Sequence, residues 1–185
     1  REQDYYDVTA QIFALGIAEK VDAIIIAGDI FDSMKPPDAA VLMLQTLVKD
    51  ANAHGIQVLG IDGNHDCCDS GWLRVCGIKP LDGVLETVRG ITVTGINSAR
   101  PAVFNDRLSK LKEIEASHGP IHILVVHQAL AELAGFANPN LTALQIATVA
   151  APLGVQYVAL GDIHTYAETV IGGIRFAYSG SPEVN

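Results

Sequence analysis

The chain has 185 residues, 49% of them hydrophobic, and its 12 basic and 21 acidic residues give a formal net charge of −9. This length suits one sizeable core, so we expect a single domain over 1–185, and the negative charge argues against a protein that holds nucleic acid by bulk electrostatics alone. No apolar run reaches the ~18 residues that indicate a membrane span, and we expect a soluble cytoplasmic protein without a secretory leader or membrane contact.

Apolar spacing predicts alternating helices and strands along the chain. Val8, Ile12 and Leu15 recur at the three-to-four spacing of an amphipathic helix, whereas the continuous apolar run before Gly28 is typical of a buried parallel strand. In chain order we expect helix 7–20, strand 21–29, helix 36–55, strand 56–61, strand 91–97, helix 105–119, strand 121–128, helix 141–154, strand 156–162 and a hairpin over 169–180. This alternation indicates an α/β fold whose right-handed crossovers place the strand ends on one side.

Polar side chains follow four of the expected strands, at the point where each strand ends. The carboxyl ends of strands in α/β sheets are where ligands bind. A mixed set of carboxylate, amide and imidazole donors suits Mn²⁺, Fe or Zn²⁺ better than a metal that selects thiolates. The residues are Asp29 and Asp32, then Asn64, His65 and Asp66, then His127, and finally Asp162 and His164.

Each of these clusters also has a simple structural explanation. A Gly-Asp pair after a strand is common in turns and helix caps, and GNHD over 63–66 is compatible with an ordinary loop. A lone histidine on an apolar strand, such as His127, is often a hydrogen-bonded core residue. The joint occurrence after four separate strands favours a ligand site.

In this order the motifs resemble those of the calcineurin-like metallophosphoesterases. AGDIFD over 27–32 is similar to that family's Gly-Asp-x-x-Asp motif, and GNHD is its Gly-Asn-His-Asp/Glu motif. His127 matches the family's isolated histidine, GDIH over 161–164 stands where the family has Gly-His-x-His, and AYSGSPE resembles the segment that follows. Within the family, these segments most resemble the SbcD-type DNA-repair nucleases.

The resemblance implies a four-layer α-β-β-α sandwich that carries two divalent metal ions. Asp29 would bridge both ions, Asn64, His127 and Asp162 would hold the second, and His164 would hold the first. We expect Mn²⁺, with Fe, Zn²⁺ and Mg²⁺ as alternatives. A carboxylate at 162, where the family has an imidazole, tilts the preference from Zn²⁺ towards Mn²⁺ or Mg²⁺.

The resemblance assigns the other polar residues to roles around the metal ions. His65 would act as the catalytic residue, donating to the leaving or non-bridging oxygen of the phosphate rather than binding metal. Asp32 and Asp66 would orient His65 or the metal ligands.

One family feature is missing from the sequence. The family begins with an Asp-x-His motif on a first strand, and nothing before Asp29 matches it. We therefore expect a catalytic domain truncated at both ends, which lacks its first strand and a capping domain.

The leading functional hypothesis is a metal-dependent DNA nuclease subunit that acts in repair or recombination with an SMC-like ATPase, and a homodimer is compatible with it. The alternatives are a small-substrate phosphatase or cyclic nucleotide phosphodiesterase on the same fold, and a catalytically inactive binding scaffold. The scaffold is disfavoured by the retained Asp29, Asn64, His65 and His127, and favoured by the absent Asp-x-His motif and by Asp162.

Overall fold

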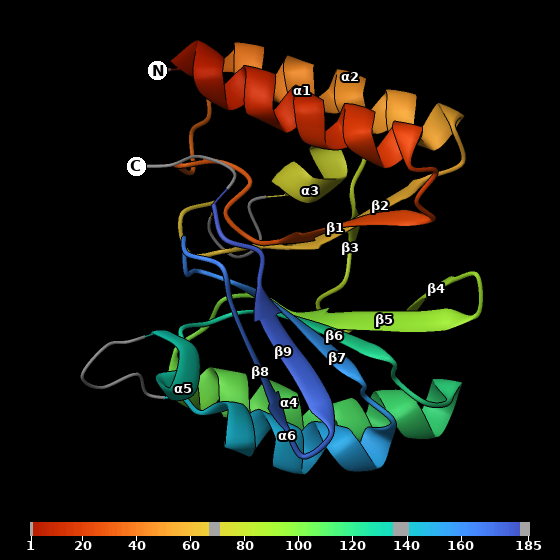
Figure 1. Cartoon of the computed structure of the whole chain (residues 1–185), viewed down its shortest axis with the longest axis vertical. Helices are drawn as coiled ribbons and strands as arrows, with labels where there is room; N and C mark the ends of the chain where they lie inside the picture. Colours follow the sequence, from red (N-terminus) through yellow and green to blue (C-terminus); the bar gives the residue numbers. More distant parts are fainter. Residues whose placement is uncertain (1, 67–70, 135–140, 182–185) are drawn as a thin grey trace.

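The computed structural model describes residues 2–66, 71–134 and 141–181, which form two β-sheets flanked by helices (Figure 1). The first sheet has three parallel strands in the order β1-β2-β3. Two long helices lie side by side on its outer face. The bounds are β1 (Ala23–Ala27), β2 (Gln57–Ile61), β3 (Lys79–Pro80), α1 (Glu2–Ala18) and α2 (Asp38–Ala53).

The second sheet has six strands in the order β4-β5-β6-β7-β9-β8. Its four central strands run parallel, while β4 and β8 pair antiparallel at the two edges. The bounds are β4 (Glu86–Val88), β5 (Ile91–Ile96), β6 (Ile123–His127), β7 (Tyr157–Gly161), β8 (Ala167–Ile171) and β9 (Ile174–Tyr178).

Helices α4 (Pro101–His118) and α6 (Ala143–Ala150) cover the outer face of the second sheet (Figure 1). Proline at the first position suits the start of α4, because its missing N–H has no partner in a helix there. A capping box between Thr142 and Gln145 begins α6. Three short elements complete the described chain: α3 (Trp72–Val75), α5 (Ala131–Ala134) and the 3-10 helix η1 (Ala151–Leu153).

Three apolar clusters separate the layers. Successive side chains of a strand point to opposite faces, so Leu124 and Val126 of β6 pack under α4 and α6, whereas Val125 faces the first sheet. Leu59 and Ile61 of β2 meet Val125 between the two sheets. The third cluster lies between the first sheet and the helices α1 and α2. The layers therefore follow the order helices, sheet, sheet, helices (Figure 1).

The structure confirms the α/β class and the existence of each expected helix and strand, with shifts at their ends. Helix α1 begins at Glu2 rather than at residue 7, and α4 begins at Pro101 rather than at 105. Between β2 and β5 the described chain also forms β3, α3 and β4, which the sequence pattern did not indicate. Elements of two to four residues are too short to show a hydrophobic period.

Strand β1 lies at an edge of the first sheet, and its AIIIA segment is only partly buried. Apolar edge strands are uncommon, because an exposed edge offers unpaired backbone groups to other strands.

Within the described residues, no helix is both long enough and apolar enough to cross a membrane.

The core beneath the second sheet is expected to dominate stability. Leu124 is 0% exposed, so Leu124→Ala should lower the free energy of unfolding by about 2–5 kcal/mol through lost burial and the cavity left behind. The matched control is Leu144 on α6, which is 60% exposed. Leu144→Ala should change the free energy of unfolding by less than about 0.5 kcal/mol. Urea denaturation measures both variants, and equal losses would contradict this assignment of the core.

Candidate metal centre

The turns that follow β1 and β7 place two aspartates in an unusual backbone conformation. Asp29 has φ 52° and Asp162 has φ 92°. Both values are positive, and residues other than glycine rarely adopt a positive φ. Gly28, with φ 91°, precedes Asp29. Such residues cost about 1–3 kcal/mol each and concentrate at functional sites, where surrounding contacts hold them in place. The two turns are therefore shaped to aim these carboxylates.

Two glycines allow the turns to approach one another. A Cβ on Gly63 would overlap the carboxylate of Asp29, and a Cβ on Gly161 would overlap the carbonyl oxygen of Ala27. The same Cβ on Gly161 would lie 2.6 Å from Nδ1 of His127. Gly63 thus allows the turns after β1 and β2 of the first sheet to approach, and Gly161 allows β7 of the second sheet to approach β1 of the first.

The side chain of His127 lies at the centre of the site and is 2% exposed. Its Nδ1 is 2.7 Å from the carbonyl oxygen of Ala27, and because a carbonyl oxygen only accepts, Nδ1 carries a hydrogen. Its Nε2 faces three oxygens: Oδ1 of Asn64 at 2.8 Å, Oδ2 of Asp29 at 3.1 Å and Oδ1 of Asp162 at 3.9 Å. These four side chains come from the ends of β2, β1, β7 and β6.

The carboxylates around His127 alter its protonation and that of Asp29. Burial alone would lower the pKa of His127, but hydrogen bonds to Asp29 and Ala27 and the negative charges of Asp29 and Asp162 outweigh it and raise the pKa. Burial would raise the pKa of Asp29, yet hydrogen bonds from His127 and from the backbone of His65 hold it below its usual value. The cluster therefore favours a positive charge at Nε2.

The donor set fits a divalent metal ion. Because Nδ1 holds the hydrogen of a neutral imidazole, the lone pair of Nε2 would face three oxygen acceptors unless a proton or a cation lies between them. Oδ1 of Asn64 and Oδ2 of Asp29 lie 2.8 Å and 3.1 Å from Nε2, a spacing compatible with donors that share one cation, while Oδ1 of Asp162 is farther at 3.9 Å. Within the described residues, no three His, Cys, Asp or Glu side chains form a group that could hold a metal ion. The candidate set differs from such a group in that it includes the amide of Asn64.

Asp66 joins the loops that carry the donors. Its side chain is 0% exposed, and its two carboxylate oxygens accept from the backbone N–H of Ile30 at 2.7 Å and of Gly63 at 2.6 Å. The backbone N–H of His65 donates to Oδ1 of Asp29 at 2.8 Å. The structure thus places Asp66 where it braces the loops after β1 and β2.

The imidazole of His65 lies beside Asp32 at the surface. Its Nδ1 is 3.3 Å from the carbonyl oxygen of Asp32 and 3.4 Å from Oδ1 of that residue. The side chain of His65 is 51% exposed and that of Asp32 is fully exposed. Both residues are accessible to a substrate next to the centre.

His164 does not join the cluster. His164 is exposed in the turn after β7, and its carbonyl oxygen accepts from the backbone N–H of Ser181 at 2.9 Å. Among the described residues, no hydrogen bond or ion pair joins its imidazole to Asp29. The structure therefore brings together the donors expected for the second metal position, whereas no contact among the described residues links His164 to them.

One important group of the site has no signature in the sequence. The carbonyl oxygen of Ala27, which fixes the hydrogen of His127 on Nδ1, belongs to the backbone and leaves no trace in residue type. A partial signal was the need for glycine at 161, where the strands of the two sheets approach closely.

Comparison with known proteins yields one family. The profile described as Calcineurin-like phosphoesterase matches residues 2–166. The chain is 30% identical over 200 residues to the DNA double-strand break repair protein Mre11 of Sulfurisphaera tokodaii, with 100% of the chain and 49% of that protein aligned. It is 30% identical over 194 residues to the protein of the same name from Saccharolobus solfataricus, of which 50% is aligned. The chain thus spans about half the length of these relatives.

Solved structures share the fold at low sequence identity. One crystal structure aligns with a TM-score of 0.66 and 12% identity over 94% of this chain and 85% of its own. The phosphopantetheinyl hydrolase PptH of Mycobacterium tuberculosis aligns with a TM-score of 0.55 and 15% identity over 86% of this chain and 79% of its own. At this identity the likeness shows the fold alone.

The metal-free protein is expected to lose stability as the pH rises. Because the folded pKa of His127 lies above its ordinary 6.5, the stabilisation is fully present below 6.5 and is lost as the pH rises through the folded value. The contribution of Asp29, whose folded pKa lies below 3.8, is present above 3.8 and lost at lower pH. The window between 3.8 and 6.5 should therefore hold both contributions.

Chemical denaturation between about pH 5 and pH 9 tests this expectation on chelated protein. The comparison is with His127→Asn, which keeps a polar side chain but has no titrating ring, so the other histidines contribute equally to both proteins. A difference between the two proteins that stays constant across this range would contradict the assigned role of His127.

Proposed function

This chain belongs to the calcineurin-like phosphoesterase family, and from that premise we propose that it hydrolyses phosphodiesters with two divalent metal ions, Mn²⁺ foremost. The observation that carries the proposal is the position of Nε2 of the buried His127, which faces oxygens of Asn64, Asp29 and Asp162. A proton or a cation at Nε2 would satisfy that arrangement. A metal ion there would lie at the carboxyl ends of strands from both sheets.

We assign Asn64, His127 and Asp162 to the second metal position, with Asp29 shared between both. His164 and Asp29 belong to the first position. Two such ions supply positive charge to a phosphate and lower the pKa of bound water. The chain's own contribution is to present the donors on turns held by buried hydrogen bonds, so that little reorganisation is needed on binding.

We assign His65 to the phosphate rather than to the metal. Its backbone N–H binds Oδ1 of Asp29, which fixes its distance from the metal donors. Nδ1–H of the ring donates to Asp32, and the doubly protonated ring also donates from Nε2 to a phosphate oxygen as negative charge develops there. Asp32 orients the ring in this scheme, and Asp66 holds the loop from which His65 projects.

The remaining ligands of the first position are proposed to come from a further strand beside β1. That edge of the first sheet is open in the described residues, and the AIIIA segment of β1 is only partly buried. A parallel strand there would end next to Asp29 and bring an Asp-x-His pair to the centre. The pairing would also cover an exposed apolar edge.

DNA is the substrate that we propose, with an SMC-like ATPase as partner in a cytoplasmic repair or recombination complex, and a homodimer as the assembly. The support is the 30% identity to proteins named DNA double-strand break repair protein Mre11, of which this chain matches about half. With a formal charge of −9, the metal ions rather than bulk electrostatics would attract the phosphate.

The function is tested by hydrolysis assays on the full-length protein. We expect cleavage of single-stranded DNA and duplex ends with Mn²⁺ and its loss after exhaustive chelation. Turnover of small aryl phosphates without cleavage of DNA would indicate a small-substrate phosphatase instead. A protein that binds no metal and cleaves neither substrate would be a binding scaffold, and undiminished turnover after chelation would also refute the proposal.

His65→Ala should lower turnover by about 10²-fold or more while leaving metal content unchanged, because the imidazole acts on the phosphate and not on the metal. His54→Ala is the control, since His54 ends α2 on the surface and bonds only within that helix end among the described residues. Metal content by elemental analysis and turnover under saturating Mn²⁺ are measured together. Loss of metal in His65→Ala would make this residue a ligand and refute its assigned role.

A further inference from the structure

Two buried polar side chains connect the ends of β2 and β5, which belong to different sheets. Asp62 is 7% exposed and Asn97 is 5% exposed. The N–H of Asp62 donates to Oδ1 of Asn97 at 2.9 Å, and Nδ2 of Asn97 donates back to Oδ2 of Asp62 at 3.1 Å. The carbonyl oxygen of Asp62 also accepts from the N–H of Ser98 at 2.9 Å. Three hydrogen bonds therefore fasten one strand end to the other.

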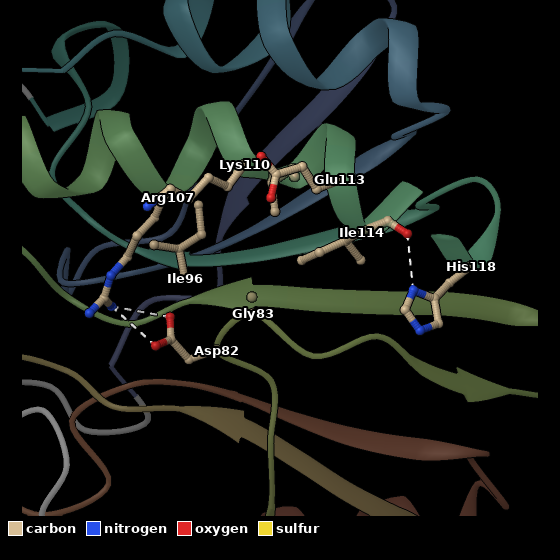
Figure 2. Close-up of a pocket in the computed structure, with 10 residues that line it drawn as sticks. Asp82, Gly83, Ile96, Arg107, Lys110, Glu113, Ile114 and His118 are labelled. Atoms are coloured by element: carbon tan, nitrogen blue, oxygen red, sulfur yellow. Dashed lines mark hydrogen bonds and ion pairs between the residues drawn. The ribbon is translucent and has the colours of Figure 1, made fainter. Parts of the chain in front are cut away.

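The network continues outward to α4. The N–H of Asn97 donates to Oδ1 of Asp82 at 2.9 Å. Nη1 of Arg107 lies 3.2 Å and 3.1 Å from the two carboxylate oxygens of Asp82. Figure 2 shows Arg107 reaching from α4 to Asp82 at one end of a hollow of about 390 Å³. The buried end of the network is thus held by a partly exposed ion pair.

The buried pair lies next to the metal centre in the sequence. Asp62 directly precedes Gly63 and Asn64, and the His65 amide follows. The centre takes Asp29 and Asn64 from the first sheet and its other donors from the second. Apolar contacts between the sheets are non-directional, whereas hydrogen bonds restrict distance to a few tenths of an ångström.

We propose that Asn97 is a positioning residue, which sets the location of the loop with Asn64 and His65 relative to His127 through its paired hydrogen bonds to Asp62. The position of the loop does not depend on any metal, whereas the effect on metal affinity rests on the proposed function. Asn97 itself touches none of the proposed metal donors in the described structure. It acts through the backbone of Asp62.

Exchanging the two functional groups separates positioning from simple loss of packing. Asn97→Asp sets two carboxylates against each other in a buried place, and like charges at that distance disfavour the pair. Asp62→Asn keeps both hydrogen bonds, because an amide oxygen can accept from Nδ2 of Asn97. In the combined variant Asp62→Asn with Asn97→Asp, the amide at 62 donates to the carboxylate at 97, so the pair is restored with its direction reversed.

The experiment measures amide hydrogen exchange at Gly63 and His65 in chelated full-length protein, with the amides of β6 as internal reference. Asn97→Asp should speed exchange at both loop amides by about tenfold or more, Asp62→Asn should change it little, and the combined variant should return to the level of Asp62→Asn. Asn52→Asp, the same substitution on the exposed face of α2, is the control and should match the wild type.

Titration with Mn²⁺ follows on the same variants, and Asn97→Asp should bind it about tenfold more weakly, with recovery in the combined variant. Wild-type protein that binds no Mn²⁺ would refute the proposed function, while the exchange rates would still decide on positioning. Exchange at Gly63 and His65 that matches the Asn52→Asp control, or that rises only in step with β6, would overturn the proposal. If Asn97→Asp does not fold, the combined variant decides: wild-type protection of the loop supports the proposal, and lost protection overturns it.

Discussion

The buried imidazole of His127 is the constraint on which the rest of the site depends. One ring nitrogen donates to the carbonyl oxygen of Ala27, so the other must meet Asn64, Asp29 and Asp162. In a neutral ring the lone pair of Nε2 would point at oxygens that also carry lone pairs, which is unfavourable for a buried imidazole. The site is therefore built for a positive charge, whether a proton or a metal ion supplies it.

Meeting this constraint imposes strain on the surrounding backbone. Asp29 and Asp162 adopt positive φ values, and Gly63 and Gly161 leave no room for a side chain. Aspartate adopts positive φ more readily than most residues, but the conformation is still uncommon, so surrounding contacts help to stabilise both turns. Asp66 contributes by accepting backbone hydrogen bonds from both loops, and the parallel strands beneath hold the ends of each turn.

The site also depends on the distance between two sheets. Two of its donors come from the first sheet and two from the second, so their separation follows from the apolar layer between the sheets and from the link between Asp62 and Asn97. A small slip of one sheet would move Asn64 away from Nε2 of His127 while leaving most apolar contacts intact. Directional hydrogen bonds between strand ends resist such a slip.

The sequence by itself determined which segments become helices and strands, and which polar residues follow them, because periodicity and chain order are local properties. It therefore indicated Asp29, Asn64, His127 and Asp162 as neighbours, and the structure brings them together. Their roles toward a metal stay predictions. Only the tertiary structure decided the rest, namely the short strands β3 and β4 and the carbonyl partner of the His127 ring. These features depend on pairing between segments far apart in the chain. The residue types and spacing within a single segment do not show which distant segment it will pair with.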